Sequence, residues 1–158
     1  MPIRTFAELL EAAKDKGPKT VAVAAAHQSE VLLASLDAEL AGLAEVVLVG
    51  DSDRIRQIAT DEGFDISRME VIHAPQYHEA AWTVMKLVSD GQAEIAMKGT
   101  VETSDFLRAA LSKDLGLRTG RLFSHVAAFE IPGFDRLIFI SDAGVIVAPD
   151  LEPDSVLP

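Results

Sequence analysis

The chain has 158 residues, of which 49% are hydrophobic, and its mean hydropathy of +0.21 predicts a single packed domain over residues 1–158 and excludes a disordered chain. Its 14 basic and 25 acidic residues give a formal net charge of −11, which repels polyanions, so we expect neither nucleic acid nor a membrane as a partner. It has no cysteine, no apolar run approaching the roughly 20 residues of a membrane span, and no signal-peptide pattern in its N-terminal residues, so we expect a cytoplasmic protein.

Segments with helical spacing of apolar residues alternate with short continuous apolar runs. The run TVAVAAA is typical of a parallel strand covered on both faces, Ser29 is a possible N-cap of the helix after it, and Asp51 starts another helix. The strand over 69–73 is less apolar, which places it near an edge. In chain order we expect a helix over 5–16, a strand over 20–26, a helix over 29–43, a strand over 45–50, a helix over 51–63, a strand over 69–73, a helix over 79–90, a strand over 93–96 and a helix over 104–111. This alternation predicts a doubly wound α/β domain with a mostly parallel sheet.

The pattern changes after residue 113. Residues 122–131 and 136–141 are expected strands, and the Pro-Gly-Phe-Asp turn over 132–135 joins them into a β-hairpin. We therefore expect an antiparallel hairpin added to the parallel sheet. Residues 150–158 are short and rich in proline and acid, and we expect an irregular tail there.

The segment Met97-Lys98-Gly99-Thr100 leaves one predicted strand and enters the next helix, with Thr103 in the helix entrance. Helix N-termini attract anions, glycine permits close approach of the backbone, and the lysine adds positive charge, so the segment is a candidate anion-binding corner. A solvated lysine beside an ordinary turn explains the pattern about equally well. Position favours the corner, because ligands of open α/β sheets bind beyond the C-terminal ends of the strands.

A second basic segment contains Arg118, Thr119 and Arg121 around Gly120. Guanidinium groups match phosphate oxygens, so this segment is a candidate anion clamp, while a solvated loop whose arginines offset nearby acids is the alternative. Ser124 and His125 follow on a predicted strand. Adjacent strand residues point to opposite faces, so these two cannot form a simple nucleophile–base pair.

Familiar catalytic and nucleotide-binding motifs are absent from the sequence, including Gly-x-Gly-x-x-Gly, the Walker loop, Gly-x-Ser-x-Gly and His-Glu-x-x-His. The four histidines show no metal-ligand spacing with nearby carboxylates, so we expect no metal site. For His27, His73 and His78 a surface or hydrogen-bonded role is the favoured interpretation.

The segments MKGTVET and GLRTGRLFSHVAAFE, together with TVAVAAA, EVVLVGD and VAPDLE, resemble the phosphate acetyl/butyryl transferases. The resemblance covers roughly residues 20–152 and is strongest to the N-terminal portion of the phosphate butyryltransferase branch. It implies reversible acyl transfer between coenzyme A and inorganic phosphate, with acyl-CoA and phosphate or acyl phosphate as substrates, no bound cofactor, and no metal.

The resemblance also implies a two-part fold similar to isocitrate and isopropylmalate dehydrogenases, an active site in the cleft between the parts, and a homo-oligomer, commonly a dimer. Its implied substrate contacts are Lys98, Gly99, Thr100, Thr103, Arg118, Thr119, Arg121, Ser124 and His125. No catalytic residue is assigned.

Members of the resembled family continue beyond the equivalent of Glu152, and that later region holds residues important to acyl transfer. We therefore expect a truncated phosphate acyltransferase-like domain that does not complete the reaction alone. Two alternatives remain open: a non-catalytic module that binds coenzyme A or a phosphorylated metabolite, and a structural or oligomerising half.

Overall fold

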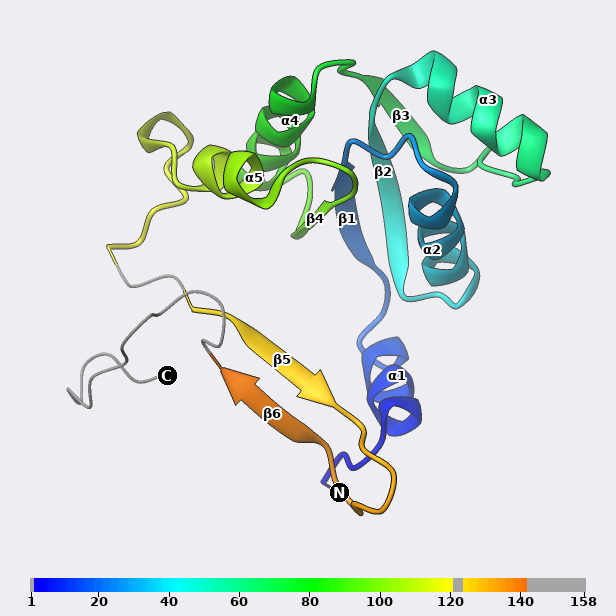
Figure 1. Cartoon of the computed structure of the whole chain (residues 1–158), viewed down its shortest axis with the longest axis vertical. Coiled ribbons are helices and arrows are strands. Elements are labelled where there is room, and N and C mark those ends of the chain that lie inside the picture. The colour runs from blue at the N-terminus through cyan, green and yellow to red at the C-terminus, as the bar shows by residue number, and fades with distance from the viewer. Residues whose placement is uncertain (1, 121–123, 142–158) are drawn as a thin grey trace. The chain divides into compact units, whose positions relative to one another are not determined.

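The structure is a computed structural model that describes residues 2–120 and 124–141 (Figure 1). The chain divides into two compact units, one formed by residues 14–119 and the other by the segments 1–13 and 120–158. The single domain expected from chain length stays a prediction. Two parts of the sequence predictions, the start of the strand over 122–131 and the tail over 150–158, lie outside the described residues.

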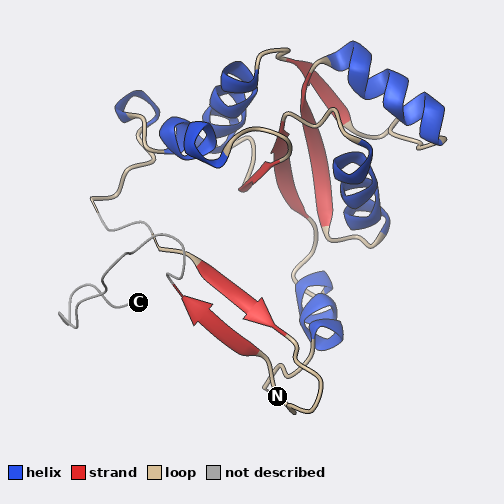
Figure 2. Ribbon diagram, in the orientation of Figure 1, coloured by secondary structure: helices blue, strands red, loops and turns tan. Residues whose placement is uncertain are grey.

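A four-stranded parallel sheet forms the centre of the larger unit (Figure 2). Its strands are β1 (Lys19–Ala24), β2 (Ala44–Gly50), β3 (Glu70–His73) and β4 (Ile95–Lys98), in the order β3-β2-β1-β4. The predicted parallel α/β sheet is confirmed, with β3 at an edge. Strand β4 begins two residues later than predicted, although Ala93 is already buried in the core and Glu94 binds the start of β1. This shift makes Lys98 the last residue of β4.

Helices cover both faces of the sheet (Figure 1). Helices α2 (Ser29–Leu40) and α3 (Ser52–Glu62) pack together on one face, and α4 (Tyr77–Ser89) and α5 (Thr103–Ala110) pack together on the other. A short 3-10 helix, η1 (Lys113–Leu115), follows α5 and was not predicted. Alternating residues of β1 separate the two cores: Ala22 and Ala24 face α4, whereas Val23 faces α2 and α3.

The ends of α3 follow the sequence prediction. The Asp51 side chain accepts hydrogen bonds from the Asp53 and Arg54 N–H groups, and Gly63 ends the helix with φ of 71°. The predicted N-cap of α2 is wrong. Gln28 occupies the cap with extended backbone and makes no side-chain cap bond, so Ser29 is already the first helical residue.

The smaller unit contains α1 (Phe6–Lys14) except its last residue, and a hairpin of β5 (Val126–Phe129) and β6 (Ile138–Ser141). The antiparallel pairing is confirmed, but the hairpin forms its own two-stranded sheet instead of extending the parallel one. The expectation of an added hairpin is wrong in this respect, because each of these strands pairs with the other within the described residues. Glu130 holds α1 to the hairpin by accepting a 2.7 Å hydrogen bond from the Phe6 N–H.

No helix within the described ranges is both long and apolar enough to cross a membrane.

Candidate functional site

The connections that follow the neighbouring strands β1 and β4 lie on opposite faces of the sheet. The chain leaves β1 toward α2 on one face, and it leaves the neighbouring β4 toward α5 on the other face. Ligands of open α/β sheets bind where two adjacent strands send their connections to opposite faces. The corner after β4, residues 98–103, lies at this switch point.

Backbone hydrogen bonds fix the corner to the end of β1. The Gly99 N–H donates to the Ala24 carbonyl oxygen at 2.7 Å, and the Thr100 N–H donates to the Ala25 carbonyl oxygen at 3.3 Å. The Thr100 hydroxyl donates to the same Ala25 oxygen at 2.9 Å. These three donors are therefore used within the protein.

Gly99 is required by its contact with β1. A Cβ at this position would lie 2.6 Å from the Ala25 carbonyl oxygen and 2.8 Å from that of Ala24, both shorter than real contacts allow. The structure therefore shows a close approach of Gly99 to β1, and the approach of its backbone to a ligand stays a prediction. Ala25 also has φ of 56°, a left-handed conformation that is unfavourable for alanine and is held here by the bonds from Thr100.

Lys98 and the start of α5 remain as the groups that can meet an anion. The Lys98 ammonium donates to the Val101 carbonyl oxygen at 3.1 Å, which uses one of its three N–H groups. Thr103 is exposed in the first turn of α5, where the first N–H groups lack helical partners. The corner thus presents one positive charge and a helix N-terminus on the same segment.

The second predicted basic segment lies away from this corner in sequence and follows η1. Leu117 packs against the core, while Arg118 and Thr119 are exposed beyond it. Arg121 lies outside the described residues. Ser124 and His125 belong to the smaller unit and precede β5, so neither is part of the strand on which they were predicted.

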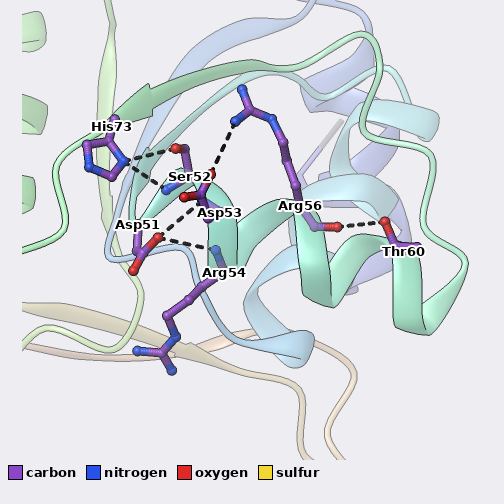
Figure 3. A network of polar contacts seen from close by, with 7 residues as sticks. All are labelled: Asp51, Ser52, Asp53, Arg54, Arg56, Thr60 and His73. Carbon is purple, nitrogen blue, oxygen red and sulfur yellow. Dashed lines mark hydrogen bonds and ion pairs between the residues drawn. The ribbon is translucent and has the colours of Figure 1, made fainter.

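Polar groups also gather at the ends of β2 and β3 (Figure 3). The Ser52 N–H and hydroxyl lie 3.3 Å and 2.9 Å from Nδ1 of His73. An N–H group can only donate, so Nδ1 is the acceptor and Nε2 carries the proton of the neutral ring. The hydrogen-bonded role predicted for His73 is confirmed. The backbone N–H groups of Arg54 and then Asp53 lower the pKa of the neighbouring Asp51 carboxyl group.

His27 is buried, with 3% of its surface exposed, and its Nδ1 atom has no hydrogen-bond partner. The predicted surface or hydrogen-bonded role is therefore wrong for this histidine. Its ring lies 5.5 Å from that of Tyr77, and a Cβ on Gly50 would come within 3.0 Å of Nδ1. Burial and then the positive charge of Arg54 lower the pKa of His27, against an opposing effect of Asp51.

A groove of about 820 Å³ lies beside the C-terminal end of β3, between α4 and α5. Trp82 and His78 line it from α4, Arg108 and Asp105 line it from α5, and His73 lines it from β3. Arg108 forms an ion pair with Asp105. The groove combines an aromatic surface with a guanidinium group. Sequence reasoning missed it, because the periodicity of each helix does not show how α4 and α5 pack against one another. Among the described residues, no cluster of histidine, aspartate and glutamate could hold a metal ion.

Residues 74–154, just over half of the chain, match the family model described as Phosphate acetyl/butaryl transferase. The chain is 44% identical to phosphate butyryltransferase of Clostridium acetobutylicum over 95% of this chain and 50% of that protein. It is 42% identical to phosphate butyryltransferase of Clostridium beijerinckii over 94% of this chain and 49% of that protein. Similarity extends to phosphate acetyltransferase of Rhizobium meliloti, at 32% identity over 93% of this chain and 46% of that protein. The chain therefore spans about half the length of the curated relatives that it matches.

Solved structures share the fold. A branched-chain phosphotransacylase from Enterococcus faecalis superposes with a TM-score of 0.67 and 24% identity, over 84% of this chain and 45% of that chain. EutD phosphotransacetylase from Staphylococcus aureus superposes with a TM-score of 0.67 and 19% identity, over 84% and 49%.

We predict that Gly99→Ala destabilises the larger unit, toward the upper end of about 1–3 kcal/mol, because the backbone oxygens of β1 cannot move aside. Urea unfolding followed by circular dichroism measures the loss. Gly42→Ala is the control, since its φ of 71° gives backbone strain of about 1–2 kcal/mol without any steric contact. A loss for Gly99→Ala no larger than that of the control would contradict the close-packing argument.

We predict that His27 makes the protein less stable in mild acid. Its pKa in the folded state lies below the ordinary value of 6.5, so the unfolded chain binds more protons. The contribution of neutral His27 to the free energy of unfolding is complete above pH 6.5 and is lost as the pH falls below that value. Urea unfolding at about pH 7.5 and about pH 5.5 should show a smaller loss of stability for His27→Phe than for the wild type. Equal losses in the two proteins would exclude this role.

Proposed function

The chain belongs to the phosphate acetyl/butyryl transferase family, and on that premise we propose that it takes part in the reversible transfer of an acetyl or butyryl group between coenzyme A and inorganic phosphate. The observation that carries this proposal is the corner after β4. Lys98 ends the edge strand β4 at the switch point of the sheet, beside the N-terminus of α5.

The reaction sets clear requirements for a site. A phosphate oxygen attacks the thioester carbonyl carbon, the carbon–sulfur bond breaks, and the thiolate of coenzyme A takes a proton as it leaves. Protein groups must hold the polyanion in line with the carbonyl and stabilise the negative charge that develops on the carbonyl oxygen. In this proposal the Lys98 ammonium and the first N–H groups of α5 hold the phosphate, and Thr103 contributes a hydroxyl group.

Gly99 and Thr100 attach the corner to the end of β1. Their donors bind the carbonyl oxygens of β1, so we assign them the positioning of Lys98 and α5 in place of direct substrate contact. The other substrate contacts that the family resemblance implies stay proposals, namely Arg118, Thr119, Arg121, Ser124 and His125.

The groove between α4 and α5 supports a site for the nucleotide end of coenzyme A. Trp82 is the sole tryptophan of the chain and is 38% exposed, which leaves its indole face accessible to an adenine ring. Arg108 lies on the facing helix, and a phosphate group would compete with Asp105 for its guanidinium.

The proposal extends to the assembled enzyme. We propose that it is a cytoplasmic homo-oligomer whose complete fold has two parts, like that of isocitrate and isopropylmalate dehydrogenases, with the corner on one wall of the cleft between them. Since the chain spans about half the length of its relatives, the opposite wall would come from the other half.

A non-catalytic module that binds coenzyme A or acyl phosphate is the second candidate, and this half-length match favours it. An assay with butyryl-CoA and phosphate that follows the release of coenzyme A separates the two. Binding without turnover at high protein concentration supports the module, and turnover by the chain alone excludes it.

We predict that Lys98→Ala weakens the binding of acetyl phosphate about tenfold, because a hydrogen bond to a charged group is lost. Isothermal titration calorimetry measures the affinity. Lys86→Ala is the matched control, since Lys86 lies in the last turn of α4 and pairs there with Asp90. Unchanged affinity in Lys98→Ala, with an unchanged unfolding curve, would refute the role of this corner.

We predict that coenzyme A alters the fluorescence of Trp82, whereas acetyl phosphate does not, because only coenzyme A carries a ring that can stack on the indole. Trp82→Ala should weaken coenzyme A binding at least about fivefold by calorimetry, in line with the energy of base–aromatic stacking. It should leave the affinity for acetyl phosphate unchanged. An equal loss of both affinities would point to disrupted folding of the groove and would count against a nucleotide site.

A further inference from the structure

The hairpin of the smaller unit carries apolar side chains on both of its faces. Directly paired residues lie on the same face, so one face holds Val126, Ala128 and Phe139 together with the polar Ser141 at its end. The other face holds Ala127, Phe129, Ile138 and Ile140. An antiparallel sheet with one solvated face alternates between apolar and polar residues, whereas this pattern is typical of strands that are covered on both faces.

Large apolar side chains on both faces are exposed. Phe139 is 64% exposed and Val126 is 53% exposed on the first face, while Ile140 is 45% and Phe129 is 43% exposed on the second. Large apolar side chains that are exposed together in this way mark an interaction site in a folded protein. Two strands alone are also marginally stable, and they gain stability when further strands or covering layers are added.

The relatives indicate what covers this hairpin. The match takes in 95% of this chain but 50% of the Clostridium acetobutylicum protein, so the relative contains about as much polypeptide again. A second copy of this chain in a two-fold contact would join one face or one edge of the hairpin to its own equivalent and leave the opposite face exposed. A different polypeptide of that length can supply both additional strands and a layer on each face.

We propose that the hairpin β5–β6 is the docking surface for a polypeptide equivalent to the other half of a phosphate butyryltransferase, which covers both apolar faces. The partner adds strands to the hairpin edge and packs apolar side chains on Phe129 and Phe139. This surface follows from the hairpin and the lengths of the relatives, and it does not depend on the acyl-transfer chemistry.

Co-expression tests the proposal. The full chain carries an affinity tag, and the probe is the half of Clostridium acetobutylicum phosphate butyryltransferase that this chain does not match. We expect co-purification of the two chains, a complex of summed mass in light scattering, and protection of residues 126–141 from hydrogen exchange relative to the chain alone.

Phe139→Asp and Phe129→Asp place one charge on each face of the hairpin, and each should reduce the captured probe at least tenfold. Leu40→Asp is the matched control, because Leu40 is 73% exposed on α2 in the other unit and its variant should capture the probe normally. Circular dichroism melting of each purified variant confirms that the larger unit is folded. A change in only one of the two hairpin variants would overturn the claim that both faces are covered.

Three further results would overturn the proposal: no capture of the probe, capture that both hairpin variants leave unchanged, or a homodimer of the chain that the hairpin variants dissociate. The last result would assign the surface to a second copy. Butyryl transfer by the purified complex is assayed separately. A complex that forms through the hairpin without activity supports the docking surface and counts against the proposed function.

Discussion

The carbonyl oxygens at the end of β1 hold the corner that follows β4. Ala24 and Ala25 together accept three hydrogen bonds from Gly99 and Thr100, and Ala25 adopts a left-handed conformation to present its oxygen. This arrangement places Lys98 at the last position of its strand and starts α5 on the opposite face of the sheet from α2. A residue with a Cβ at position 99 would push β4 away from β1 at the switch point of the sheet.

The same hydrogen bonds give the residues of the proposed site different roles. Donors that satisfy β1 cannot serve a ligand, so rigidity comes from Gly99 and Thr100 while charge comes from Lys98 and the start of α5. Preorganisation of this kind suits the proposed acyl transfer, in which a polyanion must be held at a fixed angle to a thioester. The buried ring of His27, packed against Gly50, fills the adjacent connection after β1, and its burial lowers the pKa of the imidazole.

The two units differ in how completely they bury their apolar residues. In residues 14–119, helices cover both faces of the parallel sheet and two cores form around β1. In the smaller unit the hairpin presents phenylalanine and aliphatic side chains on both faces without comparable cover in the described residues.

The sequence by itself determined the alternation of strands and helices, the antiparallel hairpin predicted from 122–131 and 136–141, the cap at Asp51 and the resemblance to the acyltransferases, because each depends on patterns within a short segment. It also directed attention to Lys98. Only the tertiary structure decided that the Gly99 and Thr100 donors are consumed, since their acceptors lie about 75 residues earlier, as for Thr100 and Ala25. It likewise decided that His27 is buried, that α4 and α5 enclose a groove, and that the hairpin forms its own sheet. These features depend on how the elements pack in three dimensions, and local periodicity carries no information about that packing.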